Sequence, residues 1–270
     1  AASETAETAE TRVPRRRSRS NDRDRTTARS NDRSARARAG RDARDARRGT
    51  VGRARDAVAR MRAARKRTFE HVEGNYATHV RARAGAATRA TEKTLDAFVE
   101  AFGELEKVSD LKREDGAHVS LSRTFACVKG DWERLFGNLR RELRDMEAFE
   151  VVFDAMRVFT NDDGSRAFVA AGFREGSTSA SKVALVRAIE RVDKAIVPLG
   201  FPKYYDDPDP HVSLLWVAGA SEERVEAMRR FAESTTVEWR VDVNRVLCDV
   251  SGQTPKTVWG RVPGLPAPDL

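Results

Sequence analysis

Histidine, cysteine and tyrosine are scarce in this chain of 270 residues, which has 4 His, 2 Cys and 3 Tyr. Cys127 and Cys248 form neither a disulfide framework nor a cluster with metal-ligand spacing. We therefore expect two buried structural thiols in a reducing compartment. The sequence also lacks an apolar stretch of about 18 residues, so we expect neither a transmembrane helix nor a secretory signal peptide.

Large apolar residues are missing from residues 1–65, which contain no Leu, Ile, Phe, Tyr or Trp. This segment holds 20 arginines and 9 acidic residues, a net charge of +11, so the other 205 residues carry −3 of the total +8. Such a segment cannot bury enough apolar surface to offset its ordering entropy. We predict a disordered, Arg-rich tail over residues 1–64, a short helix within about 52–66 at most, and one domain over 65–270.

The basic tail has two interpretations. Its arginine runs, at 15–17 and 47–48, suit a nucleic-acid tether or a nuclear localisation signal. Alternatively, the tail is a solvated low-complexity extension that attracts polyanions without a specific task. Three acidic residues among the first ten argue against an organellar transit peptide.

Two of the four histidines begin near-identical motifs that lie 93 residues apart. The first motif, at His118, reads HVSLS, and the second, at His211, reads HVSLLW. Apolar and polar residues alternate in both, which predicts a β-strand for each. Each histidine then shares a strand face with the serine two residues later, Ser120 or Ser213. Ser122 lies on the same strand face as His118 and Ser120 and is a weaker site candidate than Ser120.

Residues 65–262 combine strand alternation with helical periodicity and predict an α+β fold. The expected strands are 75–84, 117–122, 151–159, 166–173, 212–218, 237–250 and 256–262, and the expected helices are 88–106, 131–146, 179–198 and 222–232. This order divides into two parts, each with a helix followed by an H-x-S strand. We therefore predict two similar lobes with antiparallel sheets, related by a pseudo-two-fold, and an active-site cleft between them.

Two imidazoles and two hydroxyls in one cleft are suited to cleaving RNA. One histidine takes the proton of a ribose 2′-hydroxyl, which attacks the adjacent phosphorus, and the other protonates the departing 5′-oxygen. The serines donate hydrogen bonds to the phosphate oxygens as charge builds on them. This chemistry needs no metal ion, and His71 and His79 have no carboxylate pair at ligand spacing. The sequence does not decide which motif histidine is the acid and which is the base.

A run of tyrosines, aspartates and prolines (YYDDPDP) leads directly into His211. The prolines fix an extended or turned approach to the strand. Tyr204 or Tyr205 can stack on a nucleobase, as single-stranded RNA is usually held, or either ring can cap the core instead. A lone H-x-S strand is more often structural than catalytic, so the duplication of the motif is what indicates a paired site.

Three stretches of the sequence carry a family resemblance: FEHVEGNYATHV over residues 69–80, HVSLSRT from His118, and YYDDPDPHVSLLW ending at Trp216. The paired motifs resemble those of the two-histidine (2H) phosphoesterase superfamily. Within it, the chain is similar to the phosphodiesterases that trim the 3′ end of U6 small nuclear RNA. The resemblance covers about residues 65–262 and leaves the tail outside.

The resemblance implies a nuclear 3′-to-5′ exoribonuclease that removes terminal uridines and adenosines from single-stranded RNA. Such an enzyme leaves a 2′,3′-cyclic phosphate, which some members open to a 3′-phosphate. It uses no cofactor, and we expect a monomer that does not associate with membranes. The resemblance leaves two alternatives open: a 2′,3′-cyclic phosphodiesterase of the same superfamily, or a non-catalytic RNA- or nucleotide-binding module.

Site residues follow from the matching positions. The resemblance implies His118 and His211 as the catalytic pair, Ser120 and Ser213 as phosphate ligands, and Val119, Tyr205, Asp209, Pro210 and Val212 as nucleotide-binding residues, with no metal. Tyr205 matches the tyrosine that stacks on the terminal base.

Some matching positions are less clear in their role. The turn at Asn161–Asp162 is expected near the nucleotide, although the family can carry an amide where this chain has Asp162. Leu215 replaces the second serine of a fuller H-x-S-x-S pattern, which the second half of this family commonly lacks. His71 and His79 are expected to serve packing or hydrogen bonding.

Overall fold

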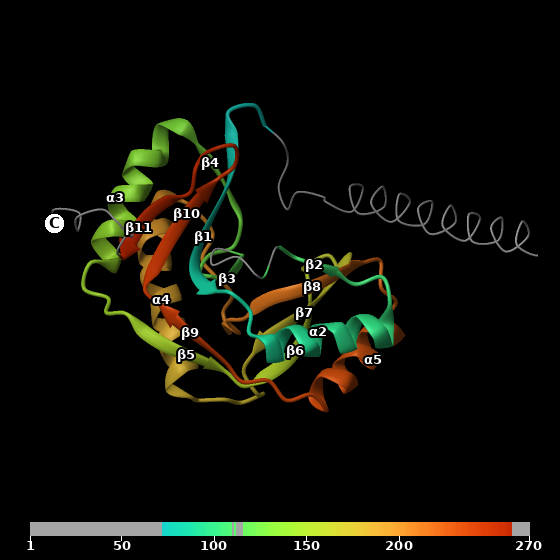
Figure 1. The fold of residues 1–270 in the computed structure, drawn as a ribbon. Coiled ribbons are helices and arrows are strands. Elements are labelled where there is room, and N and C mark those ends of the chain that lie inside the picture. Colours follow the sequence, from blue (N-terminus) through green and yellow to red (C-terminus); the bar gives the residue numbers. More distant parts are fainter. Residues whose placement is uncertain (1–71, 110, 112–115, 261–270) are drawn as a thin grey trace, which may run out of the picture. The chain divides into compact units, whose positions relative to one another are not determined.

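The computed structural model describes residues 72–109, 111 and 116–260, all within one contact unit that spans residues 59–270. The predicted tail, the helix within 52–66 and the domain boundary near residue 65 lie outside the described residues. In the described part, helices combine with antiparallel sheets, as predicted for an α+β fold (Figure 1). No helix there is long and apolar enough to cross a membrane.

A five-stranded antiparallel sheet carries the first motif. Its strands are β1 (Asn75–Gly85), β3 (Ala117–Ser120), β4 (Phe125–Val128), β10 (Arg245–Val250) and β11 (Lys256–Gly260). One edge of β1 pairs with β10, which pairs with β11. The other edge pairs with β4 along its first half and with β3 along its second half, because β1 is 11 residues long and each of these partners has only 4. The sequence analysis did not predict β4.

A four-stranded antiparallel sheet carries the second motif. In spatial order its strands are β2 (Glu106–Lys107), β8 (Val212–Ala218), β7 (Arg166–Gly172) and β6 (Ala155–Thr160). The predicted strand over 212–218 is confirmed as β8. Strands β6 and β7 form an antiparallel hairpin, and its turn depends on Asn161, whose side-chain oxygen accepts from the Arg166 N–H at 2.8 Å. Gly164 completes the turn at a φ of 67°, where a glycine carries no steric penalty.

A third, two-stranded sheet corrects the sequence prediction. It pairs β5 (Phe149–Phe153) with β9 (Trp239–Val243). The strands predicted over 151–159 and 237–250 were wrong as single elements, because the chain passes from one sheet to another at Asp154 and at Asn244. The buried positions change from odd to even numbers at both junctions, for example from Phe153 to Met156, so the alternation shifts by one residue where the chain changes sheet.

In the described part of the chain, four α-helices flank the sheets: α2 (Arg89–Phe102), α3 (Trp132–Leu143), α4 (Ala180–Ile196) and α5 (Glu222–Glu233). Short 3-10 turns occupy Lys129–Asp131 and Val197–Leu199. Thr88, Ser179 and Ser221 begin α2, α4 and α5, and each hydroxyl accepts a backbone N–H of the first turn. The helix predicted over 88–106 was too long, because Gly103 turns the chain at a φ of 56° and the next residues enter β2. Figure 1 shows α3 beside β11 and α5 beside β6.

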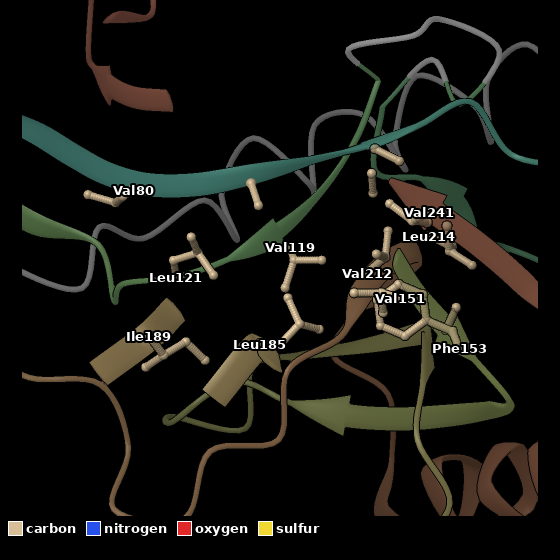
Figure 2. Packing of buried hydrophobic residues seen from close by; sticks show 14 of the residues in the cluster. Val80, Val119, Leu121, Val151, Phe153, Leu185, Ile189, Val212, Leu214 and Val241 are labelled. Carbon is tan, nitrogen blue, oxygen red and sulfur yellow. The ribbon is translucent and has the colours of Figure 1, made fainter. Parts of the chain in front are cut away.

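The apolar residues of both motifs join one hydrophobic core. Val119 of β3, Leu121 just after β3, and Val212 and Leu214 of β8 have no exposed surface. Figure 2 shows Val119 and Leu121 pointing towards helix α4. This packing confirms the predicted alternation, since it leaves the histidine and serine of each motif on the opposite side of the strand. Cys127 and Cys248 are buried free thiols, as predicted.

Candidate active site

The two motif strands lie in contact although they belong to different sheets. His118 and Ser120 lie on β3, His211 directly precedes β8, and Ser213 is its second residue. His211 is close enough to His118 to contribute to the lowering of its pKa. The structure thus places both predicted His/Ser pairs in one region of the molecule.

His118 is uncharged at neutral pH. Burial is the largest cause that lowers its pKa to about 3, followed by the electrostatic influence of His79 and Arg81. Asp249 opposes the shift. A neutral imidazole has one nitrogen with a free lone pair and can accept a proton from a hydroxyl.

His79 of β1 contacts His118 and Ser120 of the first motif. Its Nε2 lies 3.1 Å from the Ser120 Oγ, and its ring meets the His118 ring edge-on, with centroids 5.5 Å apart and planes at 71°. Burial and the charge of Arg81 lower the His79 pKa to about 4, so this ring is also neutral at pH 7. The expected hydrogen-bonding role of His79 is confirmed, whereas His71 lies outside the described residues.

Arg81 is a site residue that the sequence analysis missed. It lies opposite Ser120 in the β1–β3 ladder, and its Nε donates to Asp249 Oδ2 at 2.5 Å. Its Nη1 is buried and has no hydrogen-bond partner among the described residues. Strand alternation over 75–84 was the available signal, because it puts His79 and Arg81 on one face. The pairing of that face with β3 required the structure.

His211 is held from two sides. Its Nδ1–H donates to the Asp209 carbonyl oxygen at 2.8 Å, which leaves Nε2 available to a ligand. The Phe159 ring of β6 stacks on the imidazole, with centroids 3.9 Å apart and planes at 14°. Burial lowers the His211 pKa, and the contacts with Asp209 partly offset that shift.

The segment before His211 is fixed by ion pairs. The Asp209 carboxylate lies 3.5 Å from Arg157 Nη2 and 3.7 Å from Lys182 Nζ. Arg157 also donates through Nη1 to the Phe173 carbonyl oxygen at 3.0 Å. Pro210 is buried between Asp209 and His211. These contacts connect the segment that leads into β8 with strand β6 and helix α4.

The structure separates the two tyrosines. Tyr204 is buried in the core, whereas Tyr205 is 46% exposed. The Tyr205 hydroxyl donates to Asp162 Oδ1 at 3.1 Å, and the Arg123 guanidinium lies 4.8 Å from the centre of the Tyr205 ring. Arg123 also pairs with Asp162 at 2.6 Å. Of the two rings, Tyr205 is therefore the one available for stacking, and the 161–162 turn lies beside it.

The side chains of four further residues named in the sequence analysis are buried. The side chains of Val119 and Val212 are fully buried, so only their backbone groups can reach a ligand. Ser122 is 2% exposed and accepts the Val80 N–H at 2.8 Å. In β8 the pairing with β7 shifts between Ser213 and Leu215, and Leu215 is buried next to Leu214. This irregularity explains why position 215 does not extend the Ser213 row.

A cavity of about 670 Å³ lies along β6 and the end of α5, and it shares Arg157 and Phe159 with the site. Neither motif histidine lines it. In the described part of the chain, no group of three or more His, Cys, Asp or Glu is arranged to hold a metal ion.

The chain is similar in sequence to curated U6 snRNA phosphodiesterases. The U6 snRNA phosphodiesterase 1 of Dictyostelium discoideum is 31% identical over 153 residues, which cover 56% of this chain and 53% of that protein. The U6 snRNA phosphodiesterase 1 of Drosophila melanogaster is 28% identical over 158 residues, 58% of each chain. This chain therefore spans little more than half the length of these curated relatives.

A solved structure has a similar fold. Usb1 from Kluyveromyces marxianus, solved with uridine monophosphate, has a TM-score of 0.50 at 17% identity and covers 68% of this chain and 98% of that one, which shows a shared fold. The HVSL family model, described as an uncharacterised conserved protein, matches residues 44–256, and both motifs of this chain read His-Val-Ser-Leu. The family resemblance drawn from the motifs is thus confirmed, and the chain belongs to the HVSL family.

Proposed function

We propose that this chain is a 3′-to-5′ RNA phosphodiesterase that shortens the uridine-rich 3′ end of U6 small nuclear RNA in the nucleus. The product is a 2′,3′-cyclic phosphate, which water can open to a 3′-phosphate. The observation that carries the proposal is the contact between β3 and β8, which brings two His/Ser pairs from separate sheets together. The names of the curated relatives and the uridine monophosphate of the related structure support the choice of RNA.

In this proposal the two larger sheets are the cores of two lobes related by a pseudo-two-fold. Each lobe contributes one HVSL strand to a cleft that holds the scissile phosphate. The predicted Arg-rich tail over residues 1–64 carries a net charge of +10, which suits the RNA upstream of that phosphate. The enzyme acts as a monomer and needs no membrane.

His118 and His211 act as the acid/base pair. Burial keeps both neutral without a ligand, which suits the histidine that removes the 2′-hydroxyl proton. The other histidine must carry a proton, and the negative charge of the bound phosphodiester raises its pKa for that role. When water opens the cyclic product, the two roles exchange.

Ser120 and Ser213 donate hydrogen bonds to the non-bridging phosphate oxygens. Arg81 adds a positive charge beside Ser120, and its free Nη1 supplies a further donor. Tyr205 stacks on the terminal base, while Asp209, Pro210 and the backbone of Val119 and Val212 line the nucleotide.

The proposal is tested by incubating the full chain with an RNA that ends in several uridines and a 3′-hydroxyl. Mass spectrometry of the products is expected to show stepwise shortening and cyclic phosphate ends. His118→Ala and His211→Ala should each abolish shortening, with circular dichroism melts to confirm folding, and Ser177→Ala on the turn before α4 serves as an active control.

Two other outcomes overturn the proposal. Turnover of a 2′,3′-cyclic end without any shortening indicates a cyclic phosphodiesterase. RNA binding without turnover, retained in the double histidine variant, indicates a non-catalytic binding module.

A further inference from the structure

We propose that His79 is a positioning residue that orients the Ser120 hydroxyl so that it donates its proton to a bound phosphate. The inference rests on the proposed function, because it deepens the account of the phosphate ligands. It starts from a contact that the sequence motifs do not contain, since His79 belongs to β1 and lies outside both HVSL strands.

The geometry makes His79 a direct neighbour of Ser120. The β1–β3 ladder places Arg81 opposite Ser120, so His79 is the diagonal neighbour on the same face. Its Nε2 lies 3.1 Å from the Ser120 Oγ, within hydrogen-bonding distance. The edge-on contact with the His118 ring limits the movement of His79 on another side.

A serine hydroxyl has one hydrogen and two lone pairs. If His79 donates through Nε2–H, the Ser120 oxygen is the acceptor, and the hydroxyl hydrogen remains free for the phosphate. If His79 accepts instead, the hydrogen is used within the protein and no donor remains. The tautomer of His79 thus decides whether Ser120 can bind an anion.

The surroundings of His79 keep its ring neutral and favour hydrogen-bond donation to Ser120. Burial and Arg81 keep the ring uncharged at pH 7, so it carries a single N–H. A phosphate beside Ser120 attracts donors and therefore selects the Nε2–H tautomer. Donation into the Ser120 oxygen also polarises its O–H bond, which makes the hydroxyl a stronger donor.

The second motif provides an internal control. Ser213 lies opposite Ala170 in the β7–β8 ladder. The residue of β7 two places before Ala170, which corresponds to His79, is Phe168, whose ring has no nitrogen or oxygen to donate or accept a hydrogen bond. A positioning role therefore couples His79 to Ser120 and leaves Ser213 independent. A role confined to stability would not distinguish the two serines.

The first test is a pair of double-mutant cycles in the full chain, measured as kcat/KM on the uridine-ended RNA. His79→Leu is expected to lower kcat/KM about tenfold, less than the loss of a whole phosphate donor. It should cause no further loss in Ser120→Ala and its full loss in Ser213→Ala. His79→Gln, whose amide keeps an Nε2 donor, should restore most of the activity.

Two results overturn the inference: independent losses for His79→Leu and Ser120→Ala, or a folded His79→Leu variant within twofold of wild type. The second test does not depend on activity. The ¹⁵N chemical shifts of the wild-type histidine rings, with His79 assigned from His79→Gln, are expected to show the Nε2–H tautomer with uridine 3′-monophosphate bound. An Nδ1–H tautomer overturns the inference.

These tests separate failure of the inference from failure of the proposed function. A wild-type chain that does not shorten RNA refutes the proposed function alone. In that case the same cycles, measured as the Kd for uridine 3′-monophosphate, and the tautomer of His79 still decide whether His79 positions Ser120. Equal binding by wild type and His79→Leu then counts against it.

Discussion

Phe159 lies flat against the imidazole of His211, with ring centroids 3.9 Å apart and planes at 14°. The two residues come from neighbouring parts of one sheet, since β6 pairs with β7 and β7 pairs with β8. The stack covers one face of the imidazole, and the Asp209 carbonyl fixes its Nδ1. His211 therefore has a defined ring plane and a single free nitrogen, which is what a proton-transfer group requires.

Replacing Phe159 with leucine should damage catalysis more than folding. The variant loses the stacked ring, so His211 samples more orientations and water reaches it more easily. We expect kcat/KM to fall about tenfold for a modest misplacement of the ring, and the limb of the pH profile that reports His211 to move to higher pH as its pKa recovers. Phe102→Leu on α2, also a partly buried phenylalanine, is the matched control. Equal activity losses in both variants would count against the orienting role.

Stability should decrease as the pH falls from 6.5 towards 4. The pKa of His79 is lowered to about 4 and that of His118 to about 3, so in this range the unfolded chain binds protons that the folded chain does not. Stability is then highest above the unfolded pKa and declines by up to about 1.4 kcal/mol per pH unit for each proton. Urea unfolding at pH 7 and pH 5 measures the effect.

The matched comparison uses His79→Gln and His118→Gln, each of which should show a shallower decline by nearly one proton. A wild-type stability that is flat or rises towards pH 5 contradicts the burial of neutral histidines.

Tyr205 should contribute through its ring rather than its hydroxyl. Tyr205→Ala is expected to lower kcat/KM on a uridine end by about 5- to 100-fold, the range for losing one base stack. Tyr205→Phe should keep most of the activity, although it loses the bond to Asp162. Tyr204→Phe is the control, because that ring belongs to the core. A loss in Tyr205→Phe as large as in Tyr205→Ala would assign the role to the hydroxyl instead.

RNA shortening should persist in the presence of EDTA, because two histidines supply both proton transfers and the nucleophile comes from the substrate. The measurement compares rates with EDTA, without it, and after adding Mg²⁺ back. Loss of activity in EDTA and its return with Mg²⁺ would contradict the two-histidine mechanism.

The sequence predicted the parts of the fold that depend on local signals. Strand β8 and the β6–β7 hairpin have clear alternation and a turn, and α4 begins at a capping serine. The junctions at Asp154 and Asn244 were missed, because each apolar run was taken as one continuous strand although its buried positions shift by one residue at the junction. Strand β2 was not predicted and its first residue, Glu106, was taken as the end of a helix, because the two residues of β2 are defined only by pairing with β8.

In the candidate site, too, residues with a local sequence signal were predicted, whereas residues placed by strand pairing were not. The histidines and serines were found because each pair repeats along the chain at a spacing of two residues. Arg81, Asp249 and Phe159 were not found, because their places depend on which strands pair. Leu215 was recognised in the sequence as standing in place of a second serine, but the irregular β7–β8 pairing that separates it from the Ser213 row appears only in the structure.

The most direct test of the central claim is an RNA with a single 2′-deoxynucleotide on the 5′ side of one linkage near its 3′ end. If the ribose 2′-hydroxyl is the nucleophile between His118 and His211, mass spectrometry should show shortening that stops at that linkage, while the all-ribose RNA is shortened past it. Cleavage through the 2′-deoxy position would mean that water attacks the phosphorus, and it would contradict the account.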